Sequence, residues 1–303
     1  MSGPVPAPAL PAPAFPAPTF PAGACDTHIH VYDRRRPAAP GALLNPPDAS
    51  FADYAAVRRE LGLERVVVVQ PTTYGLDNRV QLDALAASGI DGRAVVVIDD
   101  TTPLAEIGRL HDRGARGARF HQLPGGALTW AMMPAVAARV AAFGWHVQLQ
   151  TNGHDLAERV EDLLALAVPV VVDHVGRFMP PAPPGSVAAD ALFRLVDSGR
   201  AWVKLSAPYE SSRDGAPVYP VVSDLARALV RRAPERMLWG SNWPHPGQPA
   251  ATDPATLRTL AFDWMPDPVA RRRILVDNPA ALYGFPLISD PDEPSSSNPS
   301  EHP

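Results

Sequence analysis

The chain has 303 residues, of which 46% are hydrophobic and 19% charged, a composition that excludes intrinsic disorder of the whole chain. With 32 acidic against 27 basic residues, its net charge of −5 has the wrong sign for a general nucleic-acid binder. No apolar run approaches the roughly 20 residues that cross a bilayer, and a single cysteine, Cys25, cannot form an internal disulfide. We therefore expect a soluble, cytoplasmic protein with no nucleic-acid or membrane partner.

The two ends of the chain differ in composition from its middle. Eight prolines fall within residues 4–21 (PVPAPALPAPAFPAPTFP), a polyproline-type pattern without the basic start or continuous apolar segment of a secretory signal. The last segment, SDPDEPSSSNPSEHP from Ser289, is polar and has no aromatic residue. We expect residues 1–22 and 289–303 to be disordered and residues 23–288 to form one folded domain.

Short apolar runs, many of them β-branched, recur through the domain and predict eight strands. In chain order they are Ala24–Val31, Arg65–Gln70, Ala94–Ile98, Ala115–His121, Trp145–Gln150, Val168–Asp173, Ala201–Ser206 and Met237–Ser241. Between them, alanine, leucine and arginine recur at helical spacing in Phe51–Leu61, Arg79–Ser88, Pro103–Arg113, Met133–Phe143, Leu156–Leu166, Ala188–Ser198 and Val221–Arg232.

This alternation of strand and helix requires a parallel sheet, and eight repeats match the size of an α/β (β/α)8 TIM barrel. An open, doubly wound sheet is the alternative, but no GxGxxG loop follows the first strand. In a barrel, the active site forms where the strands end. Polar residues gather at those ends: Asp26, His28, His30, Gln70, Arg119, His121, Gln148, Gln150, Asp173, His174, Lys204, Ser206, Ser241, Asn242 and His245.

Three histidines have the placement of metal ligands or carbonyl-polarising groups. His28 and His30 are two residues apart on a strand, so both side chains point the same way, into the barrel mouth. His174, at the end of the sixth strand, can supply a third imidazole. Three neutral imidazoles suit zinc or another divalent ion.

Seven motifs together resemble the amidohydrolase superfamily, and within it the 2-pyrone-4,6-dicarboxylate lactonase group. They are DTHIH at 26–30, VVQP at 68–71, RGARF at 116–120, VQLQ at 147–150, DHVG at 173–176, VKLS at 203–206 and WGSNWPHP at 239–246. The segment DNPAALYGF at 277–285 fits the closing helix of that group. The resemblance implies a TIM-barrel fold and hydrolysis of small lactones, often carboxylated intermediates of aromatic or sugar-acid catabolism.

Two departures from the family pattern affect the chemistry. The fourth strand ends without the lysine or carboxylate that bridges two metals in many relatives, so we expect at most one divalent ion, zinc or manganese, or action without metal. Asn242 stands where the family commonly has an aspartate that acts as general base. Because an amide cannot take a proton, the base would have to be His174, another imidazole or a metal-bound hydroxide.

Recognition of an anionic substrate is the other expectation. The fork of Arg119 can bind a carboxylate at two points. Gln148 and Gln150 are two residues apart on one strand, so their side chains can line the same pocket. Lys204 is expected to form a salt bridge or to pack its aliphatic stem near the barrel rim rather than to take part in the chemistry. The remaining predicted substrate contacts are Tyr74, Arg213 and His245; Glu210 stands near a position where several relatives carry arginine, which Arg213 would replace.

The catalytic prediction is thus a lactone hydrolase that uses His28, His30, His174 and Asn242 on a small anionic substrate. A lactone isomerase, in which a substrate hydroxyl replaces water as the nucleophile, is the second hypothesis. A non-catalytic metabolite binder is the third. The sequence has no marker of oligomeric state.

Overall fold

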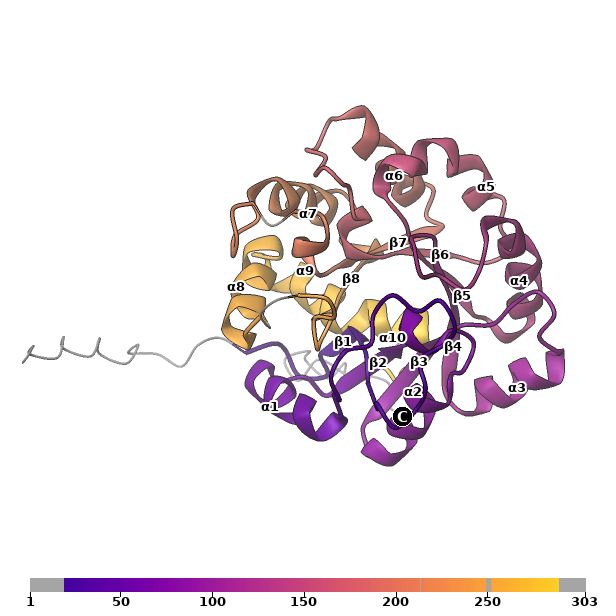
Figure 1. Ribbon diagram of the computed structural model, residues 1–303. Helices are drawn as coiled ribbons and strands as arrows, with labels where there is room; N and C mark the ends of the chain where they lie inside the picture. The colour runs from indigo at the N-terminus through magenta and orange to yellow at the C-terminus, as the bar shows by residue number, and fades with distance from the viewer. Residues whose placement is uncertain (1–18, 213, 249–251, 289–303) are drawn as a thin grey trace, which may run out of the picture.

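Eight parallel strands in the order β1 to β8 form the centre of the computed structural model, with helices around them (Figure 1). The structure describes residues 19–212, 214–248 and 252–288. The strands are β1 (Cys25–Ile29), β2 (Arg65–Val69), β3 (Asp91–Val96), β4 (Ala115–His121), β5 (His146–Gln150), β6 (Val170–Val172), β7 (Ala201–Leu205) and β8 (Met237–Trp239). This arrangement confirms the predicted (β/α)8 barrel.

A helix follows each strand, and three shorter helical segments close the domain. They are α1 (Phe51–Leu61), α2 (Arg79–Ser88), α3 (Leu104–Asp112), α4 (Met133–Val140), α5 (Val160–Leu164), α6 (Val187–Asp197), α7 (Pro220–Arg232), α8 (Pro254–Trp264), α9 (Pro268–Arg272), a π-helical turn (Arg273–Asp277) and α10 (Asn278–Tyr283). The first two match the predicted bounds, whereas α8 follows an Asp253 N-cap that the sequence analysis does not single out. Within the described residues, no helix has the length and apolarity needed to cross a membrane.

The barrel closes between β1 and the segment after β8. The backbone N–H of Asn242 donates to the carbonyl of His28 at 2.9 Å, and the N–H of His30 donates to the carbonyl of Trp243 at 2.8 Å. The buried carboxylate of Asp26 accepts from the N–H of Ser241 at 2.9 Å and from the hydroxyl of Tyr54 at 2.9 Å. These bonds place His28 on β1, and His30 directly after it, beside Asn242 and Trp243.

Side chains that point into the barrel change from apolar to polar along the strands. Cys25, Trp202 and Leu238 belong to a buried apolar cluster that Tyr283 of α10 joins. Two residues beyond Trp202, the same face of β7 carries the fully buried Lys204. The apolar layer therefore forms the floor on which a polar layer rests near the carboxyl ends of the strands.

The folded domain begins before the predicted boundary at residue 23. Phe20 is buried, and its ring lies 4.9 Å from that of Trp239, edge to face, and 6.1 Å from that of Phe262. The proline-rich composition around Phe20 hides this anchor, because a single aromatic residue has no periodicity. Most of the two predicted tails, residues 1–18 and 289–303, lies outside the described residues.

We expect Phe20→Ala to lower the free energy of unfolding by about 3 kcal/mol, the low end for a buried phenylalanine. Urea denaturation measures this change. Leu287→Ala is the matched control, because that side chain is 82% exposed and its loss should change stability by less than about 0.5 kcal/mol. Equally small effects in both variants would show that the domain starts after residue 20.

Candidate active site

A cavity of about 290 Å³ opens at the carboxyl ends of the strands. Five of the predicted site residues line it: His30, Arg119, Gln150, His174 and Asn242. Other lining residues include Tyr32, Leu43, Leu44, Thr72, His121, Arg177 and Glu210. The position agrees with the rule that barrel enzymes carry their chemistry at this end.

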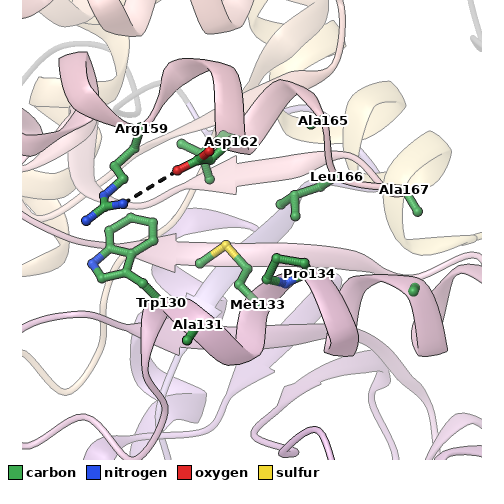
Figure 2. Close-up of a pocket in the computed structure, with 11 residues that line it drawn as sticks. Trp130, Ala131, Met133, Pro134, Arg159, Asp162, Ala165, Leu166 and Ala167 are labelled. Carbon is green, nitrogen blue, oxygen red and sulfur yellow. Dashed lines mark hydrogen bonds and ion pairs between the residues drawn. The ribbon is translucent and has the colours of Figure 1, made fainter.

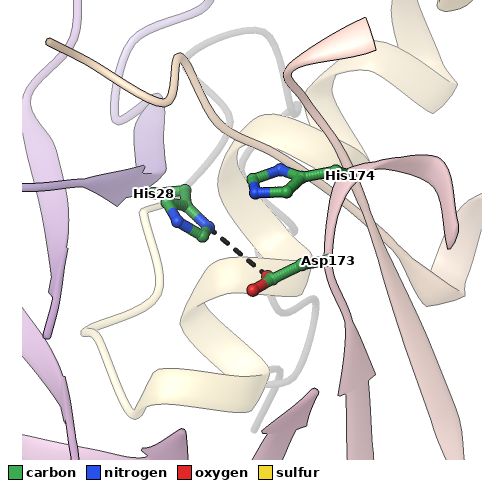
Figure 3. A group of neighbouring side chains, drawn as sticks. All are labelled: His28, Asp173 and His174. Atoms are coloured by element: carbon green, nitrogen blue, oxygen red, sulfur yellow. Dashed lines mark ion pairs between the residues drawn. The ribbon is translucent and has the colours of Figure 1, made fainter. Parts of the chain in front are cut away.

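At the base of the cavity, His28, Asp173 and His174 lie close together (Figure 3). The Nδ1 atom of His28 lies 3.4 Å from Oδ1 of Asp173, and the two imidazole centroids are 4.8 Å apart. One potential ligand atom from each residue lies within 4.8 Å of the others. The motifs place Asp173 at a strand end but predict no role for it as a ligand; its position directly before His174 is the signal that indicates one.

Lys204 and Gln148 hold this cluster from below. The ammonium of Lys204 donates to the carbonyl of Thr27 and to Oε1 of Gln148, each at 2.7 Å, and lies 3.4 Å from Nδ1 of His28. Gln148 in turn donates from Nε2 to Oδ2 of Asp173 at 3.1 Å. Gln148 is therefore placed below the cavity rather than among the residues that line it, and Lys204 makes the buried polar contacts expected of a structural cation.

Burial keeps the imidazoles of the site neutral. Desolvation lowers the pKa of His30 to about 3, and it also sets the pKa values of His28 and His174 well below the ordinary histidine value. The Nδ1 atom of His30 lies 2.7 Å from the carbonyl oxygen of Val69, which can only accept a hydrogen bond. Nδ1 therefore carries the proton, and the lone pair of His30 is on Nε2.

The guanidinium of Arg119 is fixed by two acceptors. It donates from Nη1 to the carbonyl of Gln70 at 2.8 Å and from Nη2 to Oε1 of Gln150 at 2.6 Å. Asp173 Oδ2 lies 3.8 Å from Nη2, so the arginine also offsets the buried carboxylate. These contacts place a rigid positive group in the cavity wall.

Asn242 belongs to a hydrogen-bonded chain with Tyr209 and His245. The amide Nδ2 of Asn242 donates to the hydroxyl of Tyr209 at 3.0 Å, and that hydroxyl lies 2.7 Å from Nδ1 of His245. Since the hydroxyl accepts from Asn242, it is free to donate to His245. The Oδ1 atom of Asn242 is buried without a hydrogen-bond partner in the described structure. His245 contacts Tyr209 and is not among the residues that line the cavity.

Two other predicted substrate contacts are placed differently. The hydroxyl of Tyr74 accepts from the N–H of Asp33 at 2.8 Å and lies 3.2 Å from its carbonyl. Tyr74 thus ties two loops together and does not line the cavity. Arg213 lies outside the described residues. The sequence analysis missed Arg177, whose Nε donates to Oε2 of Glu210 at 3.2 Å on the cavity wall.

The His28, Asp173 and His174 cluster fits a single divalent metal. Nε2 of His28 and Oδ1 of Asp173 are buried and have no hydrogen-bond partner. Neutral imidazoles and a carboxylate are ligands that zinc accepts. Compared with the predicted trio, Asp173 takes the place of His30 in this group.

A larger cavity, about 670 Å³, lies outside the barrel between α4 and α5 (Figure 2). Trp130, Met133 and Leu166 provide much of its wall, and Arg159 pairs with Asp162 at its edge. No histidine or cysteine lines it. Its charged lining residues, Arg159 and Asp162, pair with each other, so the smaller cavity with its histidines at the strand ends is the candidate active site.

Comparison with known proteins agrees with this placement. The amidohydrolase family model matches residues 25–285. The chain belongs to the amidohydrolase family. This amidohydrolase is 38% identical over 266 residues to a D-galactarolactone isomerase of Agrobacterium fabrum, covering 86% of this chain and 91% of that protein.

It is also 37% identical over 281 residues to a 2-pyrone-4,6-dicarboxylate hydrolase of Comamonas testosteroni, covering 86% and 90% of the two chains. Among solved structures, an Agrobacterium tumefaciens protein in its apo form superimposes with a TM-score of 0.85 at 37% identity, covering 90% of this chain and all of that one. The protein is therefore an enzyme of the amidohydrolase superfamily.

The burial of Lys204 predicts how the stability of the folded enzyme depends on pH. Desolvation lowers its pKa to about 8 in the folded enzyme, whereas an unfolded lysine keeps its proton to about pH 10.4. Between these values the unfolded chain binds more protons, so stability attributable to Lys204 rises with pH. We expect the unfolding free energy of the wild type, minus that of Lys204→Met, to rise by about 2 kcal/mol between pH 8 and 10.

Urea denaturation of both proteins at each pH measures this difference. Because Lys204 is the only lysine in the chain, the tyrosines and other groups that titrate in this range are common to both variants and largely cancel. A difference that stays constant or falls with pH would show that Lys204 keeps its ordinary pKa.

Proposed function

We propose that this amidohydrolase opens the ring of a small, carboxylated lactone by attack of water on the acyl carbon. The observation that carries the proposal is the placement of neutral, desolvated imidazoles beside a fixed arginine in one cavity at the strand ends. The relatives named as a galactarolactone isomerase and a pyrone-dicarboxylate hydrolase both act on lactone rings, which supports this substrate class.

The imidazoles can divide the work of carbonyl activation and proton transfer. Ser206 lies 2.8 Å from Nδ1 of His174. In the metal-free enzyme, the hydroxyl would donate there and Nε2 of His174 would carry a proton to offer to the carbonyl oxygen; if Nε2 instead held a metal, Nδ1 would carry the proton and donate to Ser206. The free lone pair of His30 can accept a proton from the attacking nucleophile. A donor placed at the developing oxyanion stabilises the tetrahedral intermediate most in such a desolvated site.

The two arginines of the cavity wall would bind the carboxylate of the substrate. Arg119 is held by two hydrogen bonds, and Arg177 lines the same cavity. A charged hydrogen bond of this kind contributes about 1.5–3 kcal/mol to binding. The proposed substrate is therefore an anion.

A single zinc or manganese ion is the proposed cofactor, held by His28, Asp173 and His174. Such an ion supplies Lewis acidity toward the lactone carbonyl. The protein's own contribution is to keep the ligand imidazoles neutral and oriented. Turnover of the metal-stripped enzyme, with and without added zinc or manganese, decides whether catalysis depends on the ion.

A panel of carboxylated lactones in ¹⁸O-labelled water tests the proposed reaction. Hydrolysis is expected to give the ring-opened acid with one labelled oxygen in the new carboxylate, detected by mass spectrometry. Protection against thermal unfolding without conversion of any lactone, with or without metal, would identify a binder and contradict the proposal.

Lactone isomerisation is a second candidate, and Asn242 favours it. The cavity lacks an aspartate at this position, and an amide cannot activate water by taking its proton. A hydroxyl of the substrate, held against Oδ1 of Asn242, could attack the same carbonyl in place of water. The labelled-water experiment separates the two reactions, because isomerisation gives a rearranged lactone without label.

We expect Asn242→Asp to reduce turnover about tenfold or more at all pH values, because a carboxylate loses the donor to Tyr209 and repels an anionic substrate. The backbone of Asn242 has φ of 59°, a conformation that both asparagine and aspartate tolerate. The pH–rate profile measures the effect. A gain in hydrolysis with a new acidic limb near a carboxylate pKa would instead show that asparagine had weakened a lactonase.

A further inference from the structure

Glu210 is a carboxylate in the wall of a cavity whose other charged side chains are the arginines Arg119 and Arg177. It ends the short 3₁₀ turn Pro208–Glu210 after β7, and its side chain is 18% exposed. Tyr209, the residue before it, points to Asn242 and His245 instead. The turn therefore places Tyr209 against Asn242 and His245, and Glu210 in the cavity wall.

The charged groups of the wall add up to a single positive charge. Arg119 and Arg177 are positive and Glu210 is negative, while Asp173 and Lys204 offset each other below. One carboxylate of a ligand can pair with the arginines of this wall, whereas a second carboxylate on the side of Arg177 would meet Glu210.

The cavity also has hydrogen-bond acceptors that need donors. Oδ1 of Asn242 is buried and unpartnered. The lone pair of His30 is on Nε2, since Nδ1 faces the carbonyl of Val69. Glu210 accepts from Nε of Arg177, which uses only part of the capacity of a carboxylate. A planar dicarboxylated ring has no hydroxyl to give these atoms, whereas a sugar-acid lactone has several.

We propose that Glu210 is a specificity-determining residue that accepts hydroxyl groups of a polyhydroxylated lactone with one carboxylate. This inference rests on the proposed function, because it names the substrate class of the same site. Glu210 also holds Arg177 by one nitrogen, so that the other guanidinium nitrogens can face the carboxylate of the substrate. Discrimination against dicarboxylated rings then follows from charge, and selection of hydroxylated rings follows from the unpaired acceptors.

Steady-state kinetics on two substrates tests the role of Glu210. One is a sugar-diacid monolactone with free hydroxyls, and the other is an unsaturated lactone with two carboxylates and no hydroxyl. We expect the wild type to prefer the first. Glu210→Gln should lower kcat/KM for it about tenfold or more, mainly through KM, and raise kcat/KM for the second.

Two further variants and two further measurements complete the design. Glu210→Asp keeps the charge and should keep the preference for the hydroxylated lactone. Glu64→Gln is the matched control, because Glu64 is exposed and precedes β2 at the opposite end of the barrel. Thermal melting of each variant shows whether it is folded, and calorimetry with the two ring-opened acids measures the same preference as binding.

The possible outcomes separate the two claims. A wild type that prefers the dicarboxylated compound, in turnover or in binding, overturns the inference about Glu210. An unchanged preference in folded Glu210→Gln overturns it as well. If the wild type converts neither lactone but binds the hydroxylated acid through Glu210, the proposed reaction fails while the assignment of Glu210 is upheld.

Discussion

The buried carboxylate of Asp173 is the group on which the rest of the site depends. A carboxylate in a barrel interior is costly unless cations and donors surround it. Here Gln148 donates to Oδ2, Arg119 and Lys204 lie within 4.0 Å, and His28 faces Oδ1 at 3.4 Å. Removal of any cation would leave a buried charge uncompensated, so these side chains act as one unit. Asp173 thereby faces the ring of His28, while Nδ1 of His174 lies 2.8 Å from Oγ of Ser206.

The same burial decides which chemistry the histidines can perform. An imidazole that stays neutral offers one donor and one lone pair, which suits carbonyl activation, proton relay and metal binding. Asn242 extends this logic, since it adds a fixed amide without adding charge and is held by Tyr209. The only carboxylate of the cavity wall, within the described residues, is Glu210. The substrate that we propose for this site is thus a polar anion rather than a strongly charged one.

Much of the fold was predictable because apolar residues recur with different spacing in strands and in helices, and the two patterns alternate along the chain. The bounds of α1 and α2 match the prediction, and eight strands follow in the expected order. The motifs also located His30, Arg119, Gln150, His174 and Asn242, which meet in one cavity. Parity alone could not show that Gln148 lies beneath the cavity, that Tyr74 bonds to Asp33, or that Arg177 reaches Glu210. Such facts depend on loop paths and on contacts between residues far apart in sequence.

The central claim is that burial keeps the three histidines of the site neutral at working pH. Imidazole ¹⁵N chemical shifts, assigned by single histidine replacements, test it most directly. The account predicts that His28, His30 and His174 keep the shifts of neutral rings from pH 7.5 down to pH 5 in the folded enzyme. Titration of any of the three rings near the ordinary histidine pKa of about 6.5 would contradict it.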